Sequence, residues 1–204
     1  MLGTMFLVIV NPTATWTNLR HMQPRALAVR SVVALLLFGA IAPVASYFGT
    51  TTMGWRIGTG DSVRLTPDSA FDMALAFYAA ILMASLTVAK LIHWMSGTYG
   101  ATQPLARALA LAVYSAAPLY LIGIVQLYPV LWLNFLLGLP ALACTVYLLH
   151  CGVPITMDIS KDRAFLFSNG IVTVGLVMLV GLLALTAGLW GIGVGPQFEV
   201  GTGS

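Results

Sequence analysis

Charged residues are scarce in this sequence. Only nine Lys and Arg and six Asp and Glu occur among 204 residues, whereas 59% of the residues are hydrophobic. A water-soluble domain of this composition would expose large apolar patches. The composition therefore excludes a soluble globular fold and predicts an integral membrane protein.

Motifs for catalysis or metal binding are also missing. The sequence has no Walker loop, no Gly-x-Ser-x-Gly elbow, no His-Glu-x-x-His and no Cys-x-x-Cys. The string Gly58-Thr59-Gly60-Asp61 matches intramembrane aspartyl proteases, but Asp61 falls in a polar loop, so we interpret it as a glycine turn. The cysteines, Cys144 and Cys151, lie in one predicted helix about 10 Å apart along its axis, too far for a disulfide. We predict no enzyme activity, no catalytic residue, no metal and no cofactor.

Long apolar runs dominate what remains. About 20 helical residues cross the hydrocarbon core of a bilayer, and the runs are apolar on all sides rather than alternating as in a barrel strand. The sequence predicts an all-α integral membrane bundle of five transmembrane helices, at residues 32–49, 69–92, 105–127, 130–151 and 170–191.

Basic residues divide unequally between the two ends of these spans. With the amino terminus in the cytoplasm and the carboxyl terminus outside, two basic residues lie outside, Arg56 and Arg64. The remaining seven lie inside, as the positive-inside rule requires: Arg20, Arg25, Arg30, Lys90, Arg107, Lys161 and Arg163.

Three regions follow from this topology. Residues 1–31 form a cytoplasmic interfacial segment, residues 32–192 the five-span domain and residues 193–204 a flexible tail. Residues 1–10 would reach only about 15 Å as a helix, so we expect them along the inner interface rather than across the membrane. Residues 152–169 are predicted to be a longer inner loop, and Tyr128-Pro129 the turn between the third and fourth spans. Pro43, Pro118 and Pro140 lie within spans and can kink them.

Three polar residues share the outer third of the predicted membrane: Asp72, Gln126 and Asn134. Because buried polar groups in a bilayer are costly unless paired, such a cluster is a candidate site for an ion, a proton or a small solute. In the other interpretation, Asp72 caps its helix or pairs with an arginine, and the two amides bridge the helical hairpin. Both interpretations stay open.

The inner boundary carries the candidate cytoplasmic contact face, which comprises Lys90, His93, Arg107, His150, Lys161 and Arg163. Basic residues there favour anionic headgroups, and no carboxylate stands at ligand spacing to the histidines for a metal site. We expect membrane lipids and a cytoplasmic protein as partners, and no nucleic acid. Alanines spaced by four along the spans suit packing within the bundle or a homo-oligomer face.

The stretch from Tyr114 through Pro118 to Gly123, followed by Tyr128-Pro129, forms a helix-hairpin motif. Together with the segments 147–154 and 48–55, it resembles the YIP (Ypt/Rab-interacting protein) family of five-span membrane proteins over about residues 30–192. The short amino-terminal region is more similar to the bacterial inner-membrane branch. In eukaryotes, members associate with Rab-type small GTPases and influence vesicle traffic.

The resemblance implies a location in the bacterial inner membrane. Together with the missing catalytic motifs, it predicts a non-enzymatic scaffold that organises the membrane or binds a partner through its basic cytoplasmic face. The alternative is a small solute or ion transporter or channel that uses the outer-third polar cluster.

Overall fold

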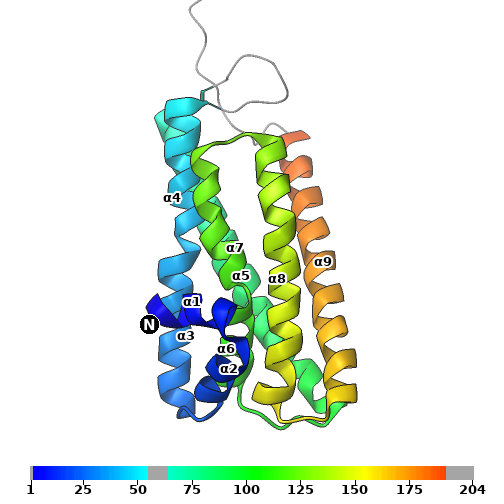
Figure 1. Cartoon of the computed structure of the whole chain (residues 1–204). Coiled ribbons are helices and arrows are strands. Elements are labelled where there is room, and N and C mark those ends of the chain that lie inside the picture. The colour runs from blue at the N-terminus through cyan, green and yellow to red at the C-terminus, as the bar shows by residue number, and fades with distance from the viewer. Residues whose placement is uncertain (1, 55–63, 192–204) are drawn as a thin grey trace, which may run out of the picture.

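The computed structural model describes residues 2–54 and 64–191, and the elements assigned there are all helices (Figure 1). Four of these helices are long and apolar enough to cross a membrane, and a fifth span results if one bent pair is counted as a single crossing. The predicted all-α membrane bundle is confirmed. Two short helices, α1 (Leu2–Val10) and α2 (Pro12–Arg20), precede the spans.

The first span is broken near its middle. It consists of α3 (Pro24–Gly39), α4 (Ile41–Phe48) and the π-helical turn η1 (Gly49–Met53). Pro43 has no N–H for the carbonyl four residues earlier, so the helix is interrupted at Ala40. Carbonyls at the end of α3 then need other partners. The Tyr78 hydroxyl of α5 (Pro67–Ser96) donates to the Leu36 carbonyl at 2.9 Å.

The segment predicted as the third span is broken more sharply. Its parts are α6 (Leu105–Ser115), α7 (Ala117–Ile122) and the 3-10 turn η3 (Gly123–Leu127), with a bend of 42°. Pro118 lies in the first turn of α7, where its ring excludes continuation of α6 but suits a new helix start. The hydroxyls of Tyr120 and Ser85 share a hydrogen bond of 2.9 Å. Thus α5 makes a hydrogen bond to each of the two broken spans.

The last two spans are α8 (Leu131–Met157) and α9 (Lys161–Gly191). α8 continues through Pro140 and Pro154. Helices of 27 and 31 residues are about 40 and 46 Å long, which exceeds the hydrocarbon thickness of about 30 Å. The loop predicted at 152–169 was therefore wrong, because both helices extend beyond the bilayer core and only 158–160 connect them.

The first membrane helix likewise begins earlier than the predicted residue 32. It starts at Pro24, so the end of the 1–31 segment belongs to the same helix as the span. The predicted tail at 193–204, with Arg56 and Asp61 of the outer loop, lies outside the described residues.

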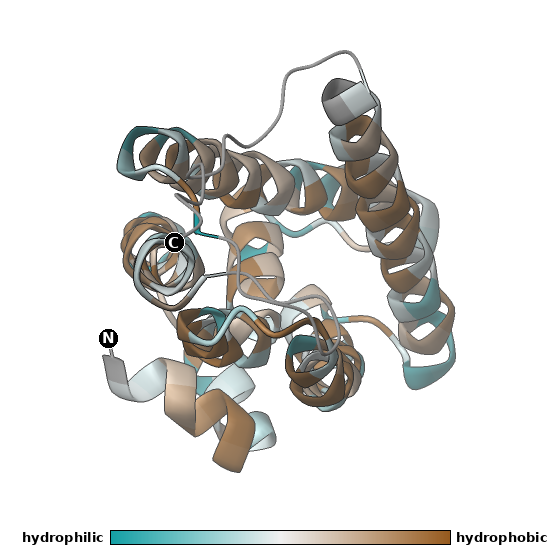
Figure 2. Ribbon diagram, turned by 90° about the horizontal axis from the view of Figure 1, so that it is seen from above, coloured by the Kyte–Doolittle hydropathy of each residue, from teal (hydrophilic) through white to brown (hydrophobic). Residues whose placement is uncertain are grey.

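The perimeter of the bundle is apolar. Large side chains such as Phe135, Val177 and Leu183 are more than 60% exposed, and brown, hydrophobic residues make up much of the helices in Figure 2. The buried core instead holds Leu111, Tyr114, Leu148 and Phe167, none more than 1% exposed. Apolar side chains are stable at a surface that contacts hydrocarbon rather than water, so the exposed side chains mark the lipid-facing surface.

The basic end as a candidate contact surface

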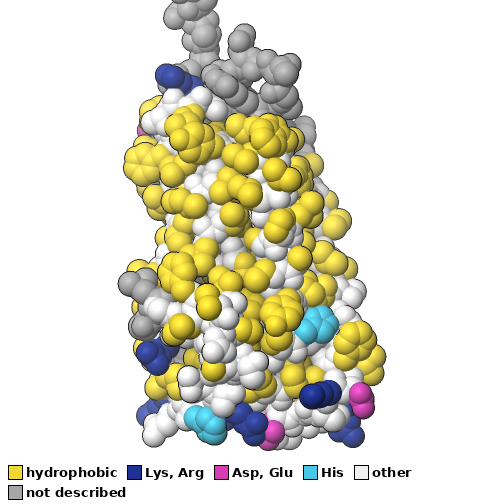
Figure 3. Space-filling model, viewed as in Figure 1, with side chains coloured by type: hydrophobic (Ala, Val, Ile, Leu, Met, Phe, Trp, Pro, Cys, Tyr) yellow, Lys and Arg dark blue, Asp and Glu magenta, His cyan; other side chains and the backbone are white. Residues whose placement is uncertain are grey.

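Charged side chains gather at one end of the bundle, which we call the basic end. In the face shown in Figure 3, the blue, magenta and cyan side chains lie mostly at the bottom, below a broad yellow zone. The basic end is formed by the start of α3, α6 and α9 and by the end of α2, α5 and α8. Its seven Lys and Arg side chains and two Asp side chains, Asp158 and Asp162, give a net charge of +5.

One ion pair joins the amino-terminal helices to the spans at this end. Arg20 Nη2 lies 2.9 Å from Asp158 Oδ1, and the two side chains are 38% and 57% exposed. It is the only ion pair within residues 2–54 and 64–191. The other six basic side chains of the basic end therefore have no carboxylate partner in the described chain and leave the surface strongly positive.

The predicted contact face lies on four helices. Lys90 and His93 are exposed near the end of α5, and Lys161 and Arg163 are exposed in the first turn of α9. The tertiary structure brings the Arg163 side chain close to Gly100, which has a left-handed backbone conformation. A Cβ added to Gly100 would lie 3.0 Å from Arg163 Nη1.

The remaining two members of the contact face are half-buried. Arg107 lies in the first turn of α6, and its buried Nε has no hydrogen-bond partner in the described structure. His150 contacts the Val146 carbonyl through Nδ1 at 2.9 Å, and its ring lies 5.8 Å from that of Phe165. These contacts place His150 between α8 and Phe165 of α9. No group of three or more His, Cys, Asp or Glu suited to a metal occurs within the described residues.

Trp16 attaches α2 to this end of the bundle. The indole is fully buried and lies against Gly152 of α8, which Leu111 of α6 also approaches. A Cβ on Gly152 would lie 2.7 Å from Trp16 Cε2 and 2.7 Å from Leu111 Cδ1, so only glycine leaves room for the ring. Leu19, one turn further along α2, is 3% exposed. The amino-terminal segment is thus packed as part of the bundle.

The start of α9 is positioned by an aromatic stack. Tyr99 of the 3-10 turn η2 (Gly97–Tyr99) stacks on Phe167 with ring centroids 4.8 Å apart. Gly170, one turn beyond Phe167, allows Met95 of α5 to approach closely. These contacts hold Lys161 and Arg163 at a defined place on the basic end.

The three outer polar residues do not form a connected cluster. No hydrogen bond or ion pair within the described structure joins Asp72, Gln126 and Asn134. The Asn134 amide donates to the carbonyl oxygens of Val130 at 2.9 Å and of Tyr128 at 3.4 Å. Asp72 is exposed on α5. Asn134 therefore serves the hairpin turn.

The hairpin motif has a structural role at each position. Tyr114 is buried in the core, Pro118 begins α7, and Pro129 is buried in the turn after the exposed Tyr128. Gly123 lies against α4, where a Cβ would come within 2.7 Å of Ala42 Cβ and 3.1 Å of the Ala42 backbone. The motif therefore packs the broken third span against the broken first span.

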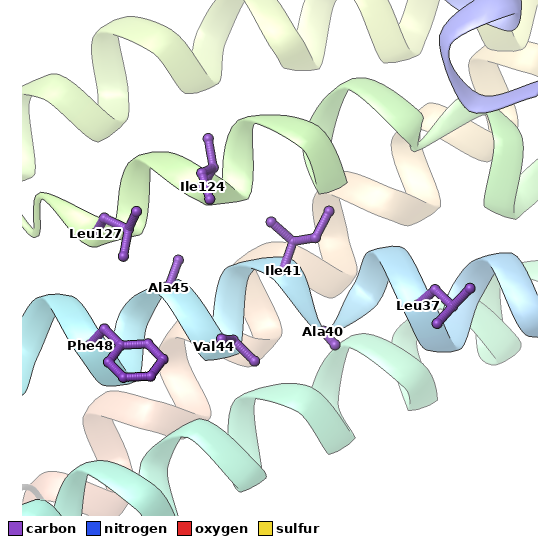
Figure 4. Close-up of a pocket in the computed structure, with 8 residues that line it drawn as sticks. All are labelled: Leu37, Ala40, Ile41, Val44, Ala45, Phe48, Ile124 and Leu127. Atoms are coloured by element: carbon purple, nitrogen blue, oxygen red, sulfur yellow. The ribbon is translucent and has the colours of Figure 1, made fainter. Parts of the chain in front are cut away.

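An apolar groove of about 330 Å³ opens beside this contact (Figure 4). Leu37, Val44 and Phe48 line one wall, and Ile124 and Leu127 line the other. Its walls include none of the three outer polar residues. The groove is suited to hydrocarbon rather than to a charged solute.

Sequence reasoning missed Trp16, Gly152, Asp158 and Tyr99 as a group that positions the contact surface. A glycine directly after the predicted span 130–151 was an available signal, because helical glycines often mark close approach. The hydropathy pattern does not reveal which residue approaches it.

Comparison with known proteins gives one family. A model described as the Yip1 domain matches residues 6–191. The sequence is 38% identical to the Escherichia coli K12 protein named "Inner membrane protein YohC" over 159 residues, which cover 78% of this chain and 82% of that protein. The protein of the same name from Escherichia coli O6:H1 has the same identity and coverage. No solved structure matches. The predicted family resemblance and inner-membrane location are confirmed.

Proposed function

This chain belongs to the Yip1 domain family, and from that premise we propose that it is a non-enzymatic scaffold of the bacterial inner membrane whose basic end is the contact surface. The observation that carries the proposal is the set of six Lys and Arg side chains without a carboxylate partner in the described chain, all at one end of an otherwise apolar bundle. In this model the basic end faces the cytoplasm, as the positive-inside rule requires.

Electrostatics makes this end a surface for anions. Each Lys or Arg near a membrane surface attracts anionic headgroups by about 1 kcal/mol. Exposed Lys161 and Arg163 flank exposed Asp162 in the first turn of α9, and exposed Arg25 lies in the first turn of α3. Acidic lipids or an acidic segment of a cytoplasmic protein would both meet the same positive potential.

Rigid attachment distinguishes this surface from a flexible basic tail. The buried Trp16 and the Arg20–Asp158 pair fix α2, and the Tyr99–Phe167 stack fixes the start of α9. Fixed charges retain their spacing, so a partner does not have to order the surface on binding. This supports a scaffold that presents a preformed contact face.

Site-specific crosslinking from the basic end tests the proposal. A photoreactive residue in place of exposed Ser160 should form a discrete adduct with one protein or with anionic lipid in inside-out vesicles supplied with cytoplasm. The same residue in place of exposed Thr52, near the opposite end, is the matched control. The adduct should fall several-fold when Lys161→Gln and Arg163→Gln are combined. Equal adducts from both positions, or no effect of the two substitutions, would contradict the proposal.

A further inference from the structure

α1 lies across the bundle rather than along it. Figure 1 shows α1 running crosswise to the spans, and the view down the bundle in Figure 2 shows it lengthwise at the periphery. It packs against α6, α7 and α8. Met5 and Val8, both 0% exposed, form the side that faces the bundle.

The other side of α1 is apolar as well. Phe6 is 55% exposed, Leu7 56% and Val10 81%. The helix, LGTMFLVIV, has no charged residue, and its only polar side chain is Thr4. In water this face would be unfavourable by about 25 cal/mol for each Å² of apolar surface. We therefore expect an apolar molecule to cover this face.

The surroundings identify that occupant as lipid. The exposed side of α1 continues the apolar perimeter of the bundle, seen as the yellow zone above the charged end in Figure 3. That perimeter is the membrane-facing surface of the protein. Hydrocarbon chains that cover the spans therefore also cover Phe6, Leu7 and Val10.

The chain changes polarity directly after α1. Asn11 donates its backbone N–H to the Leu7 carbonyl at 2.8 Å, and its side chain accepts from Ala14 N at 3.4 Å, so it ends α1 and caps α2. α2 exposes Thr13, Thr17 and Asn18. The lipid-facing surface thus gives way within one turn to a polar surface that leads to Arg20.

We propose that α1 is an in-plane membrane helix, embedded in the acyl chains of the leaflet at the basic end and absent from the other leaflet. A helix of nine residues is about 14 Å long and at least about 10 Å wide, so it displaces lipid from one leaflet only. The protein consequently has a larger cross-section in that leaflet and favours membranes in which that leaflet is convex.

The attachment of α2 makes α1 a fixed wedge rather than a loose anchor. The buried Trp16 packs on Gly152 of α8, and α1 itself is packed through Met5 and Val8. The depth of α1 is therefore set by the spans. This inference rests on the proposed membrane-organising role for its consequence, but it concerns a different surface from the basic end.

Fluorescence quenching in liposomes tests the position of α1. The two cysteines are replaced by alanine in the full chain, and an environment-sensitive NBD probe is attached at Phe6→Cys or, as the control, at Asn18→Cys. The Phe6 probe should emit at shorter wavelength and be quenched several-fold more strongly by doxyl groups on acyl chains than by aqueous iodide. The Asn18 probe should show the reverse. Equal iodide quenching at both positions would overturn the inference.

Membrane curvature tests the wedge itself. Protein in giant vesicles with its basic end on the outer leaflet should be enriched several-fold on narrow tubes pulled from them. The double variant F6N/L7N, which leaves Met5 and Val8 in place, should lose this enrichment, whereas T13N/T17N on the polar face of α2 should retain it. Unchanged melting temperatures would verify folding, and F6N/L7N enrichment equal to the parent protein would overturn the wedge.

The two proposals fail in different ways. Loss of the Ser160 adduct with normal quenching at Phe6 would contradict only the contact surface. Iodide quenching at Phe6 with the adduct intact would contradict only the in-plane helix.

Discussion

The Trp16 indole packs directly on the Cα of Gly152, with Cε2 2.7 Å from the position that a Cβ would occupy. This contact joins the amino-terminal helices to α8, and Leu111 of α6 approaches the same glycine. Because the indole is fully buried, the contact contributes to holding α2 on the bundle, beside buried Leu19 and the Arg20–Asp158 pair.

Adding a methyl group to this contact should release α2. Gly152→Ala places a Cβ into the ring of Trp16 and should lower stability by about 1–3 kcal/mol, as overpacking of cores does. Gly138→Ala in the same helix, where a Cβ would meet nothing within 4 Å, should instead be neutral or stabilising by up to about 1 kcal/mol. Melting temperature and proteolysis of residues 1–20 measure both. Equal effects of the two variants would contradict the packing.

The contact between Gly123 and Ala42 should also be destabilised by an added methyl group. Gly123→Ala brings a Cβ against the backbone of Ala42, which cannot move without shifting α4. We expect a lower melting temperature in detergent micelles and weaker crosslinking between the first and third spans. Gly181→Ala on α9, with open space around it, is the control and should change neither.

The Tyr120–Ser85 hydrogen bond should contribute modestly. Hydrogen bonds between membrane helices average about 0.6 kcal/mol. Tyr120→Phe should lower stability by about this amount. Ser85→Ala removes this bond and also the bond from Ser85 Oγ to the Ile81 carbonyl, so the double variant should be no less stable than Ser85→Ala alone. Additive effects would show that the hydroxyls act separately. Tyr128→Phe, whose exposed ring lies at the turn, should leave stability unchanged.

The backbone conformation of Asp158 should affect the stability of the protein more than its charge does. Its φ of 57° and ψ of 49° lie in the left-handed region, which most side chains adopt at a cost of about 1–2 kcal/mol. Its exposed pair with Arg20 is worth at most about 1 kcal/mol. We expect Asp158→Ala to lower the melting temperature more than Arg20→Ala, and Asp158→Gly to be better tolerated than Asp158→Ala. Equal losses in Arg20→Ala and Asp158→Ala would contradict this order.

The outer polar residues should not carry a solute. Asn134 is engaged with the carbonyls of the hairpin turn, and Asp72 is exposed on α5. Liposomes loaded with a pH-sensitive dye should therefore show the same proton flux with the parent protein, with Asp72→Asn and without protein. A flux that requires Asp72 would support the transporter alternative.

The elements that could be predicted are those whose signal is local. Apolar runs located the spans, and the Tyr128-Pro129 turn marked the hairpin. The boundaries at 152–169 could not be predicted, because hydropathy reports where a helix leaves the hydrocarbon and not where its hydrogen bonding ends. The break at Pro118 was signalled by proline, whereas Pro140 and Pro154 remain inside α8. Neighbouring packing decides whether a proline interrupts a membrane helix.

The candidate contact surface divides in the same way. The charges were visible as single residues, but their fixed positions depend on Trp16 against Gly152, Tyr99 on Phe167, and Arg20 with Asp158. The hydropathy pattern of the sequence does not indicate which residues on different helices contact one another.

By itself, the sequence determined the membrane class, the apolar helical segments, the asymmetry of basic residues and the family. The membrane class and the charge asymmetry depend on the hydropathy and charge of each short segment, and these can be read from that segment alone. The tertiary structure alone decided which face of α1 packs on the bundle and that α2 is attached to α8 through Trp16. Those features arise from contacts between residues far apart in the sequence. Arg20 and Asp158, for example, are 138 positions apart. Whether the shapes of two such side chains fit is decided only when the helices pack together.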